Sequence, residues 1–121
     1  MKVSMMRRSI GFFFCACFLL LSGGCQTKET PLPGHRGGQL YQGKVRMDIN
    51  CHGCHGWLGE GSIHAPALAT DGRSISYFKF YSAVTFGRGD GMPAYQRVFS
   101  EKDIKLIMDW LQLVSVLRSV K

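Results

Sequence analysis

The last quarter of the chain has the clearest pattern of hydrophobic and polar positions. Ser100 is a candidate N-cap, and Asp103 follows three residues later, which approximates a capping box. After it, apolar residues recur at helical spacing and form a wide face. This face includes Ile104, Ile107, Trp110, Leu111, Val114 and Leu117. The pattern predicts a long C-terminal helix that is largely buried.

A second helix is predicted over residues 37–50. Leu40, Tyr41 and Val45 lie at helical spacing within it. Gly37 and Gly38 stand near its start, where the lack of a Cβ lets another helix come close. We therefore expect another helix to pack closely against this end.

A third helix is predicted over residues 74–86, with Ser74 as its N-cap and Gly87 as its stop. The density of aromatic residues is also compatible with a strand. No second strand is evident elsewhere, so we favour a helix. The glycine-rich stretches 56–68 and 87–95 are predicted to be loops. The expected fold class is therefore all-α, with three to four helices.

The first 24 residues differ in composition from the rest. Arg7 and Arg8 precede an apolar run, residues 10–21, which is too short to span a bilayer. Residues 1–24 are predicted to be a secretory leader of the lipoprotein type, cleaved before Cys25. Ser22 departs from the usual leucine of that cleavage motif. An ordinary cleaved leader or an uncleaved anchor are the alternatives.

The predicted mature part begins with a tether. Residues 25–36 hold two of the four prolines and little apolar bulk, so we expect them to link a lipid on Cys25 to a domain at 37–121. His35 is expected to be solvated. The predicted location is the periplasmic side of a membrane, held by the lipid.

Charge adds little to this picture. The whole chain has a net charge of +7. From Cys25 onward it contains twelve Lys and Arg residues and eight acidic ones, which gives a net charge of +4. The basic residues are scattered singly, which argues against nucleic acid as a partner. A modest positive charge is compatible with steering toward an acidic protein partner.

The candidate chemistry lies in residues 51–55, Cys-His-Gly-Cys-His. C-x-x-C-H is the attachment pattern of a c-type haem, in which two thiols form thioethers and the histidine ligates iron. A redox dithiol would need a βαβ context, and a zinc site would need a second Cys or His pair; neither is evident. With Cys15 and Cys17 in the leader, the remaining three cysteines do not form a disulfide framework.

Three further motifs follow in order. They are Ala-Pro-Ala-Leu at 65–68, Gly-x-Gly-x-Gly-Met-Pro-Ala at 87–94, and Ser-x-x-Asp-Ile at 100–104, which opens an aromatic-bearing helix. Together with the haem motif they make residues 37–117 resemble the small class I cytochromes c. The resemblance implies the cytochrome c fold, with its N- and C-terminal helices crossing over one covalently bound haem c and its iron.

The resemblance also implies a role for each matching residue. Cys51 and Cys54 would hold the haem, and His55 would be its proximal iron ligand. Met92 would be the distal ligand, through its thioether sulfur. The backbone carbonyl of Pro66 would accept a hydrogen bond from the other ring nitrogen of His55.

Other side chains compete for the distal position. His64 would give a bis-histidine site, but we expect its loop to stay on the proximal side. Met47 and Met108 lie at helical core spacing and are expected to fill space there. Met92 precedes a proline in a loop, which favours it as the ligand. His52 is expected at the surface.

With both axial positions filled, the resemblance implies an electron carrier, not an enzyme. Such a protein would exchange single electrons with redox partners, as a monomer or as part of a complex. One alternative is the haem-bearing subunit of a membrane-associated oxidoreductase. A weaker one is a haem sensor or a peroxidase-like protein.

Overall fold

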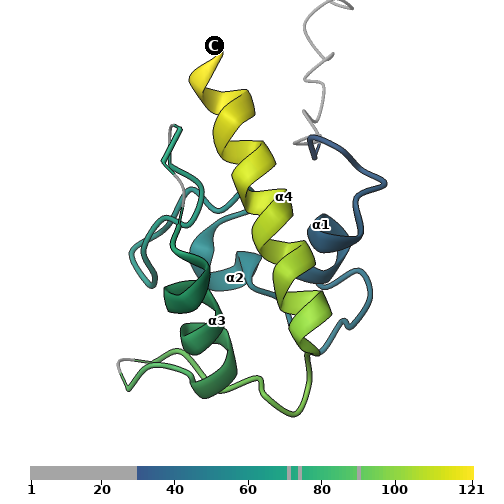
Figure 1. The fold of residues 1–121 in the computed structure, drawn as a ribbon, viewed down its shortest axis with the longest axis vertical. Coiled ribbons are helices and arrows are strands. Elements are labelled where there is room, and N and C mark those ends of the chain that lie inside the picture. Colours follow the sequence, from purple (N-terminus) through teal and green to yellow (C-terminus); the bar gives the residue numbers. More distant parts are fainter. Residues whose placement is uncertain (1–29, 71, 74, 90) are drawn as a thin grey trace, which may run out of the picture.

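The computed structural model describes residues 30–70, 72–73, 75–89 and 91–121. Its helices are α1 (Arg36–Tyr41), α2 (His52–His55), α3 (Tyr77–Phe86) and α4 (Glu101–Ser119) (Figure 1). The described residues contain no strand beyond two isolated β-bridges, so the predicted all-α class is confirmed. None of the described helices is both long and apolar enough to cross a membrane. The predicted leader and Cys25 lie outside the described residues.

Helix α4 begins as predicted. The Ser100 hydroxyl accepts a hydrogen bond from the backbone N–H of Asp103 at 3.2 Å, and Asp103 Oδ2 accepts one from the backbone N–H of Ser100 at 3.1 Å. The predicted face is buried from Ile104 to Val114, together with Met108. Leu117 is exposed instead, because the last turns of α4 project beyond the other helices (Figure 1).

The capping box offers a measurable contribution to stability. We expect Ser100→Ala to lower the free energy of unfolding by about 1 kcal/mol, because it removes the cap from a 19-residue helix. Chemical denaturation measures this. The matched control is Ser76→Ala, since Ser76 is the N-cap of α3 but makes no side-chain capping bond. Equal losses in the two variants would contradict the capping role.

Helix α1 lies across α4, as predicted (Figure 1). The backbone of Gly37 is so close to that of Leu106 that a Cβ on Gly37 would stand 1.8 Å from the carbonyl oxygen of Leu106. The ring of Tyr41 packs on that of Trp110 with centroids 5.1 Å apart, and both side chains are fully buried. This crossing forms one half of the core.

Helix α1 is much shorter than the predicted 37–50. It ends at Tyr41, and Gly43 then adopts a positive φ of 70°, which turns the chain away from the helix axis. Residues 42–50 form turns. Met47 is 90% exposed, so its predicted place in the core is wrong.

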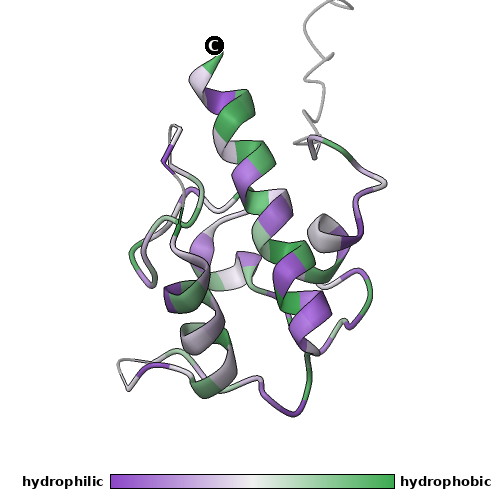
Figure 2. Cartoon of the chain, in the orientation of Figure 1, coloured by the Kyte–Doolittle hydropathy of each residue, from purple (hydrophilic) through white to green (hydrophobic). Residues whose placement is uncertain are grey.

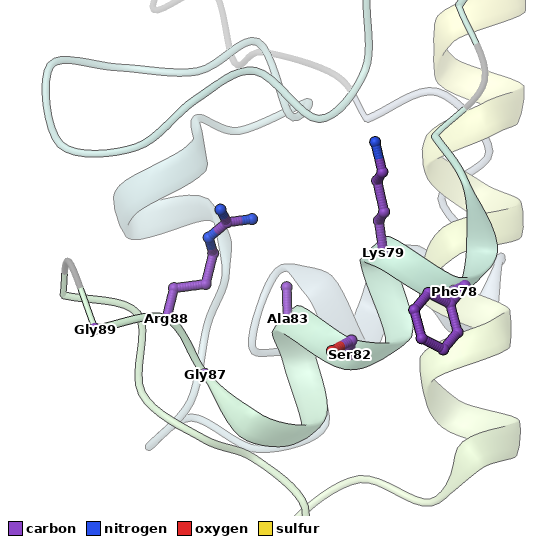
Figure 3. Close-up of a pocket in the computed structure, with 7 residues that line it drawn as sticks. All are labelled: Phe78, Lys79, Ser82, Ala83, Gly87, Arg88 and Gly89. Carbon is purple, nitrogen blue, oxygen red and sulfur yellow. The ribbon is translucent and has the colours of Figure 1, made fainter.

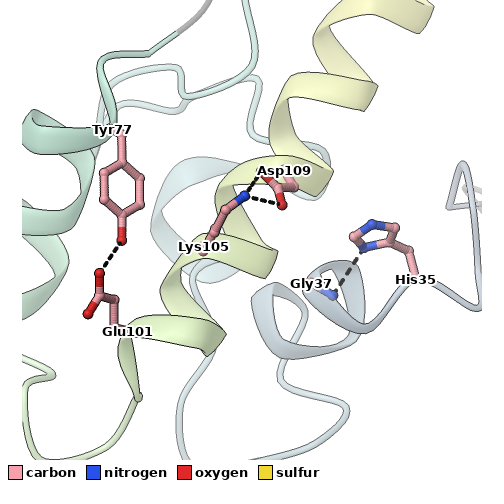
Figure 4. A network of polar contacts seen from close by, with 6 residues as sticks. All are labelled: His35, Gly37, Tyr77, Glu101, Lys105 and Asp109. Atoms are coloured by element: carbon pink, nitrogen blue, oxygen red, sulfur yellow. Dashed lines mark hydrogen bonds and ion pairs between the residues drawn. The ribbon is translucent and has the colours of Figure 1, made fainter.

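Helix α3 starts at Tyr77, and Ser76 is its N-cap; the predicted cap, Ser74, lies outside the described residues. It ends at Phe86, followed by Gly87 with a φ of 72°, as predicted. Phe80 and Val84 face the core. Tyr77 donates a 3.3 Å hydrogen bond to Glu101, which joins the starts of α3 and α4 (Figure 4).

Part of the predicted tether contacts the domain. The Pro31 carbonyl accepts a 3.4 Å hydrogen bond from Trp110 Nε1, and Thr30 bonds to the side chain of Gln42. Nδ1 of His35 accepts a hydrogen bond from the N–H of Gly37 at 3.1 Å, so this histidine caps α1 (Figure 4). His35 is therefore half-buried and not simply solvated.

Candidate functional site

The pentapeptide 51–55 forms a single helical turn, α2. Cys51 is its N-cap, and the His55 N–H donates to the Cys51 carbonyl at 2.9 Å. The Asn50 side chain accepts from the Gly53 N–H at 2.9 Å, which fixes the start of the turn. The Cys51 N–H donates to the carbonyl of Tyr41, at the end of α1. Both thiols are free and lie within one turn of each other.

The imidazole of His55 is buried and oriented by one contact. Its Nδ1 lies 2.8 Å from the carbonyl oxygen of Pro66. Because a carbonyl can only accept, Nδ1 carries the proton, and Nε2 keeps a free lone pair. This is the contact that the resemblance implies, and it leaves Nε2 as the ring atom that can bind a metal.

The loop after α2 returns Pro66 to this histidine. The Gly61 N–H donates to the His55 carbonyl at 2.7 Å, and the Ser62 hydroxyl donates to the Cys54 carbonyl at 2.5 Å. Gly61 has a φ of 85°, and a Cβ there would meet the backbone N of Ala67 at 2.7 Å. A residue with a side chain at 61 would therefore push Pro66 and Ala67 away from His55.

A cavity of about 670 Å³ opens beside α2. Its size falls within the range of roughly 300–1,000 Å³ for ligand pockets. It brings together Cys51, Cys54, His55 and Met92, four side chains that lie up to 41 positions apart. Most of its wall is apolar, with Leu68, Ile75, Phe80, Val84 and Ile107 among the lining residues. Two thiols, an imidazole and a thioether around an apolar space fit the attachment and ligation of a haem.

The loop after α3 that carries Met92, here called the Met92 loop, is held against α3 by a hydrogen bond. The Arg88 N–H donates to the Met92 carbonyl at 2.8 Å, and the Tyr95 N–H donates to the Val84 carbonyl at 2.9 Å. A Cβ on Gly87 would stand 2.6 Å from the Met92 carbonyl oxygen, so only glycine fits there. These contacts fix Met92 at the cavity wall.

Burial makes the titratable groups at the cavity hard to ionise. It raises the pKa of the Cys51 thiol to about 12, with a smaller effect from Cys54. It also raises the pKa of Tyr41, whose hydroxyl donates to the Gly56 carbonyl at 2.7 Å, and that of Tyr95. The part of the cavity around Cys51, Tyr41 and Tyr95 is therefore a low-dielectric environment, in which these three groups stay neutral at neutral pH.

Among the described methionines only Met92 lines the cavity, since Met47 is exposed elsewhere and Met108 lies in the core. His64 also lines it, although its residue is exposed. His52 is half-buried, contrary to expectation, and its ring meets Trp57 edge-on at 4.7 Å. Within the described part of the chain, no cluster of His, Cys, Asp and Glu could hold a metal ion.

Two basic residues stand at the edge of the cavity. Lys79 of α3 and Arg88 line both the cavity and a neighbouring groove of about 480 Å³. Figure 3 shows their side chains extending in the same direction from α3 and the following loop, whereas Phe78 points away. The periodic pattern alone did not indicate Tyr95, Ala83 or Asn50, which also line the cavity, because their place depends on how the loops fold back.

Comparisons with known proteins agree with this chemistry. A protein-family profile described as cytochrome c oxidase, cbb3-type, subunit III matches residues 36–111. A stretch of 48 residues, 40% of this chain, is 38% identical to cytochrome c-553I of Paracoccus denitrificans. That stretch spans about a fifth, 21%, of the relative's length. No solved structure is a significant match. Because the profile covers more than half of the chain, this protein belongs to that family of c-type cytochromes, which bind covalent haem c with its iron.

Proposed function

We propose that this protein is a one-electron carrier whose haem is attached through Cys51 and Cys54 and ligated by His55 and Met92. One observation carries the proposal: a single apolar cavity brings these four side chains together from α2 and from the loop after α3. Family membership supports electron transfer by a c-type cytochrome.

Each of these residues has a defined task. The Pro66 carbonyl holds the proton on Nδ1 of His55, which keeps Nε2 available and the ring in one orientation. Met92 offers a soft thioether, which favours ferrous over ferric iron. Bound haem supplies the Fe(II)/Fe(III) couple. The apolar wall of the cavity would exclude water from the haem and would keep the reorganisation energy of electron transfer small.

If His55 and Met92 both ligate the iron, the site would leave no place for a substrate, so we propose a carrier without enzymatic activity of its own. Its partners would be redox proteins met in brief encounters over a small surface. Lys79 and Arg88 form no ion pair with any described residue, and both line the cavity edge. They would be available to pair with carboxylate groups of a bound haem.

We further propose that the protein works on the outer side of the cytoplasmic membrane. Cytochromes c are generally exported, and the leader pattern at 1–24 supports this. A lipid on Cys25 would hold it there. If so, Cys25→Ser releases the protein from the membrane fraction.

The ligand set is tested by Met92→Ala on the exported holoprotein. A pyridine haemochrome spectrum first shows whether the haem is covalent. We then expect the ferric absorption band that marks a thioether ligand to disappear completely, and the reduction potential to fall. Met47→Ala is the matched control, because Met47 is 90% exposed and lies outside the cavity.

Retention of that band in Met92→Ala would show that another methionine is the ligand, and Met108 would then be replaced in turn. Absence of the band from the unaltered protein would instead favour His64. Carbon monoxide binding by the unaltered ferrous protein would favour the sensor or peroxidase-like alternative, since it requires a displaceable Met92.

A second candidate function is the haem subunit of a membrane oxidoreductase. The description of the matched family, a subunit of an oxidase, favours it. Affinity purification from solubilised membranes distinguishes the two. A subunit is recovered with a stoichiometric enzyme, whereas a carrier is recovered alone.

A further inference from the structure

The solvent-facing side of α4 changes character halfway along the helix. In the first half it carries Lys102, Lys105 and Asp109, and Lys105 and Asp109 form an ion pair at 3.0 Å (Figure 4). In the second half it carries Leu113, Val116, Leu117 and Val120, which we call the α4 stripe. Their spacing of three, four and seven places them on one face of the helix.

The α4 stripe is not covered by any described part of the chain. Its four side chains are between 42% and 80% exposed. The adjacent face of the same helix, with Leu111 and Val114, is fully buried in the core. In Figure 2 hydrophobic positions continue into these last turns, beyond the body of the domain. The stripe therefore extends the apolar character of α4 into solvent.

The charge around the stripe is positive. The chain has no acidic residue after Asp109, whereas Arg118 and Lys121 follow. The Arg118 guanidinium donates to the Ala69 carbonyl at 2.8 Å and forms no ion pair with any described residue. An apolar stripe flanked by cations is the pattern of a helix that lies on an anionic lipid surface.

The start of the domain lies beside the stripe. The Pro31 carbonyl bonds to Trp110, and Leu113 and Leu117 stand one and two turns further along the same side of α4. Cys25 precedes Pro31 by six residues, so a lipid on Cys25 lies within about 20 Å of Pro31 even when the chain is fully extended. The anchor would thus keep this end of α4 close to the membrane.

From these observations we propose that the α4 stripe rests on the anionic surface of the membrane. The proposal depends on the anchor at the N-terminal end, which belongs to the proposed function. It gives the protein two points of contact with lipid, one through Cys25 and one through the helix. The second contact fixes the orientation of the domain, because a single flexible lipid leaves it free to rotate.

The test is thiol protection in the full-length lipidated holoprotein, reconstituted in vesicles of phosphatidylcholine and phosphatidylglycerol. Val116→Cys places one thiol in the stripe, and Ile63→Cys, at a residue 95% exposed and outside the cavity, is the matched control. We expect a charged maleimide that does not cross membranes to react with Val116→Cys at least fivefold more slowly than with Ile63→Cys. Haem absorbance verifies folding of both variants.

Two outcomes overturn the proposal. Equal reaction rates would show that the stripe stays in solvent. Cross-linking of two copies through Val116→Cys would show that a second copy covers it. Either result, with covalent haem and membrane fractionation intact, leaves electron transfer and the lipid anchor standing. Loss of the protein from the vesicles would instead refute the anchor.

Discussion

Gly37→Ala is expected to cost about 3 kcal/mol or more of folding free energy. The added Cβ would stand 1.8 Å from the carbonyl oxygen and 2.4 Å from the carbonyl carbon of Leu106. Both atoms belong to the α4 backbone and cannot rotate aside, so the two helices must separate. Separation would also pull the Tyr41 ring from Trp110. Chemical denaturation followed by circular dichroism measures the loss.

The matched control is Gly34→Ala, two residues before α1. No atom lies within 4 Å of a Cβ at Gly34, so its substitution should change the free energy of unfolding by less than about 0.5 kcal/mol. Gly38→Ala is expected to fall between the two, because it would meet the side chain of Trp110 and not backbone. A Gly37→Ala protein as stable as Gly34→Ala would contradict the helix crossing.

Features set by neighbouring residues were predictable from the sequence. The capping box of α4 needs only Ser100 and Asp103, and its buried face follows the helical period. The glycine that ends α3 was found in the same way. The end of α1 was not, because the apolar spacing continues past Tyr41 while Gly43 turns the chain.

The candidate site likewise has features set by neighbouring residues and features that depend on distant contacts. The turn at 51–55 is local, and the resemblance indicated that Pro66 and Met92 face it from distant loops. Tyr95 and Ile107 line the cavity through contacts that no local pattern specifies. The expectation that His52 lies at the surface is wrong, because its burial depends on Trp57, whose ring packs against it.

The largest effect is expected when haem cannot be attached. Cys51→Ala with Cys54→Ala leaves a cavity of about 670 Å³ with an apolar wall and no covalent partner to fill it. Engineered cavities of about 150 Å³ exist in larger proteins, but losing even one core leucine costs roughly 3–5 kcal/mol. The whole free energy of unfolding of a native domain is only about 5–15 kcal/mol. We therefore expect the double variant to lose cooperative thermal unfolding and most of its helical signal in circular dichroism.

The comparison that isolates the haem is His64→Ala, which also alters the cavity wall but leaves both thiols and His55 in place. It should keep the full haem content and a cooperative transition. If the double cysteine variant unfolded as cooperatively as His64→Ala, the polypeptide alone would form the core. That outcome would show that the packing of α1 against α4 stabilises the domain without haem. Loss of the transition would instead show that α3 and the Met92 loop depend on the cofactor, since Val84 of α3 and Met92 of the loop line the cavity.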